Sequence, residues 1–144
     1  MDGLMKRARL RSLNRLRGFS VTDVAYVQAV YYVPTGIWPL VHMRSFEWVT
    51  GPKVDRWLVK TVGGLLTVVG VVLGLGASSQ RVTPEVRVLA VGSAVSLAMI
   101  DLVYVRRGRI RRIYTLDAIA NVGLAVAMIA ASSQSPDTDR PTDP

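Results

Sequence analysis

The sequence predicts an all-α integral membrane protein whose main part is a bundle of four transmembrane helices. Half of the 144 residues are apolar, and the mean hydropathy is +0.31. Four apolar windows, at 25–41, 61–80, 88–105 and 118–135, contain Asp101 as their only charged residue. About 20 helical residues cross the hydrocarbon core of a bilayer, with ~17 as a lower limit, so each window is long enough to span it.

Composition limits the chemistry that the chain can perform. Cysteine is absent, which excludes disulfides, zinc–thiolate sites, iron–sulfur clusters and thiol redox chemistry. A single histidine argues against a histidine-rich metal or haem site, so we expect no cofactor. The net charge of +8 would suggest nucleic acid in a soluble protein, but here the cations flank apolar windows. The expected partners are therefore the lipid bilayer and its anionic headgroups, with no nucleic acid.

Residues 1–19 form a basic arm that we expect to lie on the membrane surface. Leucines recur at every third residue among its cations, as in an amphipathic interfacial helix. A signal peptide is the rival interpretation, but Pro34 and Pro39 interrupt the apolar run and no small-x-small cleavage site follows. The arm should therefore stay attached. At the other end, residues 132–144 are rich in Ser, Pro, Asp and Thr and should form a disordered tail.

The first span is predicted at about 22–41. Ser20 and Asp23 resemble a capping box with Asp in place of Glu. Pro34 and Pro39 should kink or break the helix, because proline removes a backbone donor and clashes with the preceding turn. We favour a kinked span over a re-entrant or ligand-binding break. The aromatic residues of this span are interpreted as interfacial anchors, namely Tyr26, Tyr31, Tyr32 and Trp38.

The remaining spans of the transmembrane domain (residues 20–131) are predicted at about 56–77, 85–105 and 112–131. An amphipathic connector at 42–51 precedes them and should lie in the membrane interface. In the second span, Gly70 and Gly74 form a Gly-x-x-x-Gly pair, which lets helix backbones approach closely. Thr83 and Pro84 mark the start of the third span as N-cap and first-turn proline.

The distribution of cations leaves the orientation in the membrane open. If all four windows span, the 18 lysines and arginines divide equally between the two faces. That balance would also suit a homodimer of opposite orientations or a larger membrane complex. If the first window does not span, fifteen of the 18 fall on one face. We predict four spans, because the first window has nearly the required length and hydropathy. In either topology, the first connector and the turn at 106–112 share one membrane face.

Two aspartates occupy equivalent positions in the predicted hairpin of the third and fourth spans. Asp101 and Asp117 each lie five residues inside the nearest arginine of the turn, so both should lie roughly 7–8 Å into the bundle. The arginines of this turn are predicted to bind lipid headgroups. They are Arg106, Arg107, Arg109, Arg111 and Arg112.

Other polar residues should gather around the two aspartates, since Lys60 of the second span reaches about the same depth. The candidate polar cluster consists of Asp101, Asp117, Lys60, Glu47, His42 and Tyr104. A charge inside a membrane costs about 2.5–3.5 kcal/mol on insertion scales, so such residues are normally paired, turned inward or functional. We favour a structural ion-pair cluster that sets the helix register.

This interpretation favours a small polytopic membrane protein with a structural or accessory role. One alternative is a small proton- or cation-coupled transporter, in which the two carboxylates accept a proton or bind a cation. Another is a membrane-embedded lipid-binding protein or enzyme that uses Glu47 or an aspartate beside His42. No nucleophile elbow, metalloprotease motif or nucleotide-binding loop is present in the sequence, so we assign no catalytic residue and disfavour enzymatic activity.

The segment SFEWVTGPKVDRWLV at 45–59 follows GIWPL at 36–40. Together these segments resemble a family of small uncharacterised prokaryotic four-helix membrane proteins, over about residues 25–120. The resemblance implies a multi-pass protein of the prokaryotic inner membrane and carries no known activity. In size and span count the chain is also similar to DoxX-like proteins. Small multidrug transporters share the size, but they resemble one another through a glutamate in the first span, where this chain has Gln28.

Overall fold

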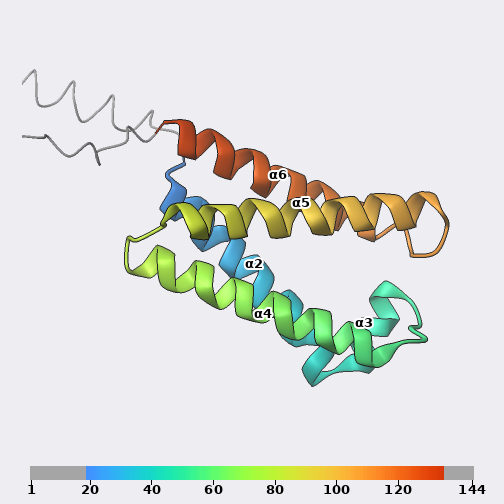
Figure 1. The fold of residues 1–144 in the computed structure, drawn as a ribbon. Coiled ribbons are helices and arrows are strands. Elements are labelled where there is room, and N and C mark those ends of the chain that lie inside the picture. Colours follow the sequence, from blue (N-terminus) through green and yellow to red (C-terminus); the bar gives the residue numbers. More distant parts are fainter. Residues whose placement is uncertain (1–18, 135–144) are drawn as a thin grey trace, which may run out of the picture.

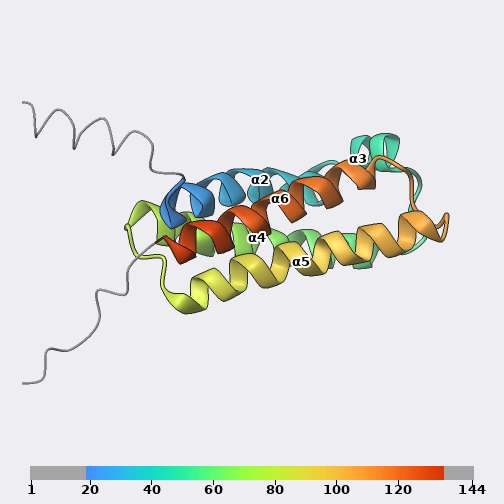
Figure 2. The ribbon, with the colours of Figure 1, turned by 90° about the horizontal axis from the view of Figure 1, so that it is seen from above.

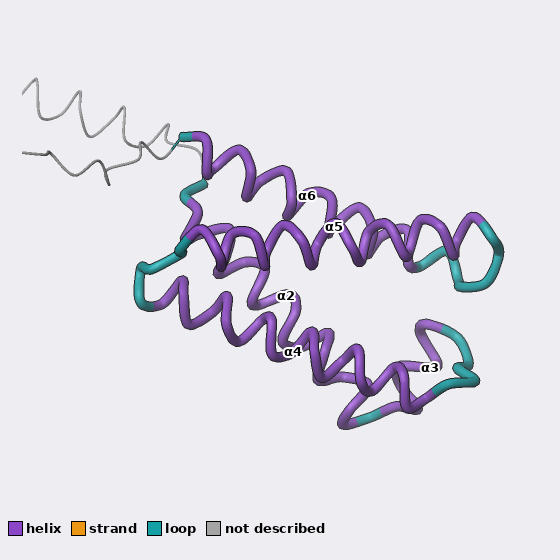
Figure 3. The backbone as a smooth tube through the Cα atoms, viewed as in Figure 1, coloured by secondary structure: helices purple, strands orange, loops and turns teal. Residues whose placement is uncertain are grey.

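The computed structural model describes residues 19–134, which fold into helices and contain no strand. The four long helices are α2 (Val21–Val41), α4 (Arg56–Ser78), α5 (Pro84–Arg106) and α6 (Tyr114–Ser133). The short α3 (Met43–Thr50) joins α2 to α4 (Figures 1 and 3). The predicted all-α class is confirmed. The predicted basic arm and tail lie outside the described residues, apart from Phe19 and residues 132–134.

Capping residues mark the starts of α2 and α5. At the start of α2, the Ser20 hydroxyl accepts a hydrogen bond from the backbone N–H of Asp23 (3.2 Å). The Asp23 carboxylate accepts one in return from the backbone N–H of Ser20 (3.0 Å), as the capping-box prediction requires. At the start of α5, the Thr83 hydroxyl accepts from the backbone N–H of Val86 and Pro84 occupies the first turn.

The helix α2 continues through both of its prolines as a single element of 21 residues. Each proline lacks a backbone donor, yet neither Pro34 nor Pro39 ends the helix. Pro39 is buried against α4, where its Cγ would lie 3.0 Å from a Cβ atom placed on Gly63. The prolines therefore lie within a packed helix and not in a broken segment.

The helices α2 and α4 pack antiparallel along a seam of glycines. Gly36 lies against Gly63, so closely that a Cβ on Gly36 would lie 2.5 Å from the Gly63 carbonyl oxygen. Further along, Gly70 packs against Val33, and Gly74 packs against Ala29. The close approach expected of the Gly-x-x-x-Gly pair is thus made by α2, and Gly36 and Gly63 extend it toward α3.

The long helices form two pairs, because α2 packs mainly on α4 while α5 packs mainly on α6. Figure 1 shows α4 and α5 diverging from the turn at 79–83 that joins them. Figures 1 and 2 agree in placing α3 and the α5–α6 turn together at the opposite end. We call the end with the 79–83 turn the closed end, and the end with α3 and the turn at 107–113 the cationic end.

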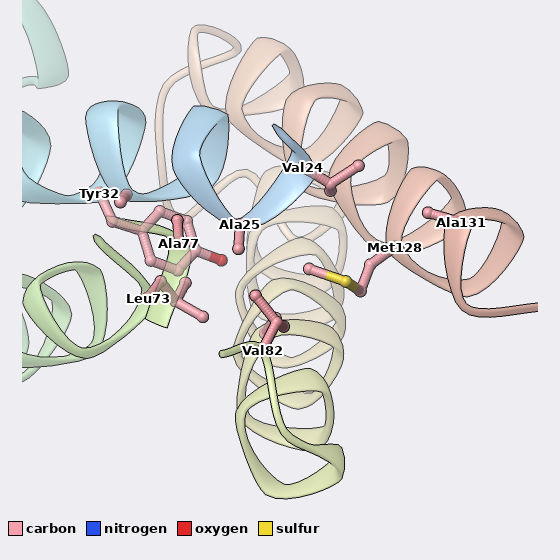
Figure 4. Packing of buried hydrophobic residues seen from close by; sticks show 10 residues of the cluster. Val24, Ala25, Tyr32, Leu73, Ala77, Val82, Met128 and Ala131 are labelled. Carbon is pink, nitrogen blue, oxygen red and sulfur yellow. The ribbon is translucent and has the colours of Figure 1, made fainter. Parts of the chain in front are cut away.

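The apolar core occupies the closed end, where all four long helices meet. Tyr32, Leu73 and Met128 are its largest fully buried apolar side chains, and Figure 4 shows them directed into the same interior space. Small residues surround them and allow the helices to come close. The buried cluster comprises Val24, Ala25, Ala29, Tyr32, Leu73, Ala77, Val82, Ala90, Met128 and Ala131.

The outward faces of α4, α5 and α6 are apolar. Large side chains such as Leu65 on α4, Ile100 on α5 and Ile119 on α6 are exposed in the isolated chain. Three helices, α4, α5 and α6, are long and apolar enough to cross a membrane. An exposed apolar surface on this scale is typical of a protein whose surroundings are lipid.

Candidate functional site

Asp101 of α5 and Asp117 of α6 form a carboxyl pair in the interior, toward the cationic end. The two carboxyl groups lie close enough to interact directly with each other. Asp101 has only 6% of its surface exposed, and its Oδ2 atom has no hydrogen-bond partner among the described residues. Two carboxyl groups share a hydrogen bond only when one of them carries a proton. The arrangement can therefore hold a proton, or a small cation between the carboxylate oxygens.

Two tyrosines of α2 connect that helix to the carboxyl pair. The Tyr31 hydroxyl donates a hydrogen bond to Oδ1 of Asp117. The Tyr32 hydroxyl donates to Oδ1 of Asn121 (2.8 Å), and the Asn121 amide donates to the backbone carbonyl of Asp117 (3.0 Å). Asn121 and Tyr32 are fully buried. Hydrogen bonds therefore hold α2 against the first turns of α6.

Gln28 extends this polar region toward the closed end. Its amide nitrogen donates to the Ala90 carbonyl of α5 (2.9 Å), while its Oε1 atom is buried and has no partner in residues 19–134. Tyr31 and Tyr32 follow Gln28 by three and four residues, so both lie on the same side of α2 as Gln28. This spacing of polar side chains within an apolar window is the sequence signal that could have indicated an inward-facing polar side of the helix. Interpreting Tyr32 as an interfacial anchor was wrong, since it is fully buried in the core.

The other predicted cluster members lie apart from the carboxyl pair. Lys60 is exposed on α4, and no cation of the described chain lies within 4.0 Å of either aspartate. Lys53, in the α3–α4 connector, is instead the cation close enough to interact electrostatically with Asp101. His42 is exposed and caps α3, where its Nδ1 atom accepts from the backbone N–H of Ser45 (3.2 Å).

Lys60 does not lie beside the aspartates, because α4 packs on α2 and diverges from α5 at the cationic end. Tyr104 lies on α5, one turn beyond Asp101, but it is 43% exposed. The arrangement of the aspartates is thus a paired carboxyl site with tyrosine and asparagine neighbours, and not an ion-pair cluster.

Glu47 belongs to a separate ion pair that joins α3 to the start of α4. Arg56 donates two hydrogen bonds to its carboxylate, from Nε (2.8 Å) and from Nη2 (2.7 Å). The backbone N–H of Lys53 donates a third (3.3 Å). The Arg56 guanidinium holds the pKa of Glu47 below its ordinary value of 4.5, and the Lys53 N–H acts in the same direction. This pair fixes the connector at the cationic end.

A cavity of about 580 Å³ lies between the α3–α4 connector and the α5–α6 turn. Four of the five predicted headgroup arginines line it, and Arg107 does not. The lining residues are Thr50, Gly51, Pro52, Lys53, Val105, Arg106, Gly108, Arg109, Ile110, Arg111 and Arg112. We call this space the cationic cavity, because five of its lining residues are basic and none is acidic.

The fold and these sites define the chain as an all-helical protein with three helices able to cross a membrane. Within residues 19–134, no three histidine, aspartate or glutamate side chains are grouped so that they could hold a metal ion. Comparison with protein-family models, with curated proteins and with solved structures found no match to the chain.

Proposed function

We propose that the chain is a multi-pass protein of the prokaryotic inner membrane in which α2, α4, α5 and α6 all cross the bilayer as a four-helix bundle. The length of α2 supports its inclusion, since 21 residues at 1.5 Å each give about 31 Å, close to the hydrocarbon thickness of about 30 Å. Its antiparallel packing along α4 supports a common depth for the two helices.

The polar residues of α2 are consistent with such a span. Gln28, Tyr31 and Tyr32 each donate a hydrogen bond to a residue of α5 or α6, so these donors need not face lipid. We also propose that Pro34 and Pro39 bend α2 locally, because each removes one backbone hydrogen bond from the helix.

Within this bundle, the carboxyl pair takes up a proton or a small monovalent cation, as in a small proton- or cation-coupled transporter. The observation that carries this proposal is the buried Asp101 carboxyl, which has an unpartnered oxygen and faces a second carboxyl. A structural ion pair would need a lysine or arginine at the aspartates, and none of the described cations lies within 4.0 Å. Charged groups buried in a membrane without such partners are typically functional.

Proton flux into liposomes tests the proposal. The full chain is reconstituted with an internal pH-sensitive dye, and a potassium diffusion potential is imposed with and without sodium. We expect Asp101→Asn and Asp117→Asn to reduce the flux to that of protein-free liposomes. Asp55→Asn is the control, because Asp55 is exposed and its side chain makes no capping hydrogen bond to α4. A wild-type flux equal to the protein-free background would contradict transport.

A structural or accessory role is the second candidate, favoured by the hydrogen bonds between helices. Tyr32 with Asn121, and Gln28 with the Ala90 carbonyl, tie α2 to both α5 and α6. In that role the aspartate variants would lower the thermal stability of the detergent-solubilised protein. The same preparations therefore separate the two candidates. Loss of flux at unchanged stability supports transport, and loss of stability without any wild-type flux supports the structural role.

A further inference from the structure

The cationic cavity has two walls from distant parts of the chain. One wall is the connector at 50–53, and the other is the turn at 105–112. Its volume of about 580 Å³ lies within the range of about 300–1,000 Å³ typical of small-ligand sites. Five of the residues that line it are basic, namely Lys53, Arg106, Arg109, Arg111 and Arg112.

Specific contacts hold the two walls together. Arg111 donates from Nη1 to the Trp48 carbonyl (3.4 Å) and packs against Gly51, where an added Cβ would lie 3.1 Å from the Arg111 Nε atom. Gly51 also has a φ of +92°, a conformation that favours glycine. On the connector, the Lys53 ammonium lies 4.8 Å from the centre of the Tyr114 ring and donates to the Thr50 carbonyl (3.3 Å). The cations therefore line a defined space.

None of these five cations forms an ion pair within the described part of the chain. The one ion pair found there joins Arg56 to Glu47, and neither of those residues lines the cavity. Five like charges around one space repel each other, and an anion placed among them would relieve that repulsion. Arginine binds phosphate oxygens through paired, charge-assisted hydrogen bonds, and lysine adds a compact positive charge.

We propose that the cationic cavity binds the phosphate group of an anionic ligand, either a phospholipid headgroup or a soluble phosphate ester. The cavity lies at the cationic end, where the apolar stretches of α5 and α6 end, which is the level at which lipid phosphates would lie if these helices cross a bilayer. The inference does not depend on the carboxyl pair or on whether α2 spans.

Binding to purified full-length protein in zwitterionic detergent tests this site. The probes are phosphatidylglycerol, followed by native mass spectrometry, and glycerol 3-phosphate, followed by calorimetry. The lining variant is Arg109→Gln with Arg112→Gln, two exposed residues whose side chains make no hydrogen bond within residues 19–134. The control variant is Arg44→Gln with Arg81→Gln, which removes the same charge from exposed residues outside the cavity.

We expect the lining variant to weaken binding by about tenfold or more, because two phosphate-binding side chains are lost, and the control to stay within about twofold. Binding of phosphatidylglycerol alone identifies a lipid headgroup, and binding of glycerol 3-phosphate alone identifies a soluble ligand. Either result, or both, supports the site. Equal weakening in the two variants, or no binding of either probe to the wild type, would overturn it.

Discussion

The Tyr31 hydroxyl of α2 donates a hydrogen bond to the carboxyl of Asp117 on α6, 86 residues further along the chain. This bond brings a helix of one packed pair to the acidic site of the other. Since Tyr31 is half-buried, the bond forms where water competes weakly for either group. The carboxyl pair is thus supported by three helices, although its two acids come from only two of them.

Tyr31→Phe should destabilise the protein by about 1.5–3 kcal/mol, because it removes a hydrogen bond to an ionisable group and leaves the acceptor without its donor. The matched control is Tyr26→Phe on the same helix, since Tyr26 is 60% exposed and its hydroxyl makes no hydrogen bond within residues 19–134. Thermal unfolding of both variants in one detergent measures the difference. Equal stability of the two variants would show that the Tyr31 bond contributes nothing.

Gly63→Ala should be strongly destabilising, whereas Gly64→Ala at the next position should not. A Cβ on Gly63 would lie 2.6 Å from the Gly36 carbonyl oxygen, and backbone cannot move aside as a flexible side chain would. Overpacking of this kind costs about 1–3 kcal/mol. A Cβ on Gly64 meets no atom within 4 Å, so the higher helix propensity of alanine should leave that variant unchanged or stabilised by up to about 1 kcal/mol. Thermal unfolding of the two variants gives the comparison, and similar melting temperatures would contradict the tight α2–α4 seam.

The bounds of the long helices could be predicted to within a few residues, because apolar length and capping residues are local properties of the chain. The predicted span at 56–77 and the observed Arg56–Ser78 illustrate this. A similar depth for Asp101 and Asp117 could also be predicted, since a short turn between two helices places residues at equal distances from it at equal depth.

Helix pairing could not be predicted in the same way. Hydropathy and charge report depth in a membrane, but they do not report the rotation of each helix about its axis or which helices adjoin. The depth expected of Lys60 therefore does not make it a neighbour of the aspartates. In the same way, the aromatic character of Tyr31 and Tyr32 does not show that their hydroxyl groups bind residues of α6. The glycines at 36 and 63 decide the pairing of α2 with α4, and they face each other only once the antiparallel register is known.

The ion pair of Glu47 with Arg56 should make the α3 connector sensitive to acid. The pKa of Glu47 is lowered in the folded chain, so the stabilisation is fully present above its ordinary pKa of 4.5 and is lost as the pH falls through the folded value. Hydrogen exchange at the amides of Met43–Thr50, corrected for the intrinsic effect of pH, should therefore accelerate below pH 4.5.

Two comparisons control that measurement. Glu47→Gln should exchange faster at neutral pH and lose the acid dependence, because the amide cannot be protonated in this range. The amides of α4 beyond its first turn should change little with pH, since the only charged side chains of that helix, Arg56 and Lys60, are basic. Acid sensitivity that persists in Glu47→Gln would assign the effect to another group.

Cysteine accessibility should show that Ser12 and Gly108 lie on opposite faces of the membrane. The natural chain has no cysteine, so a single introduced cysteine gives an unambiguous label at Ser12→Cys, Ser78→Cys, Gly108→Cys or Ser135→Cys. If α2 crosses the bilayer with α4, α5 and α6, the labels at 12, 78 and 135 react from one side and the label at 108 from the other. If only the three most apolar helices cross, the labels at 12 and 108 react together and those at 78 and 135 react from the opposite side. Four spans are distinguished from three by whether the labels at 12 and 108 react from opposite sides of the membrane or from the same side. This comparison does not depend on the absolute orientation of the protein.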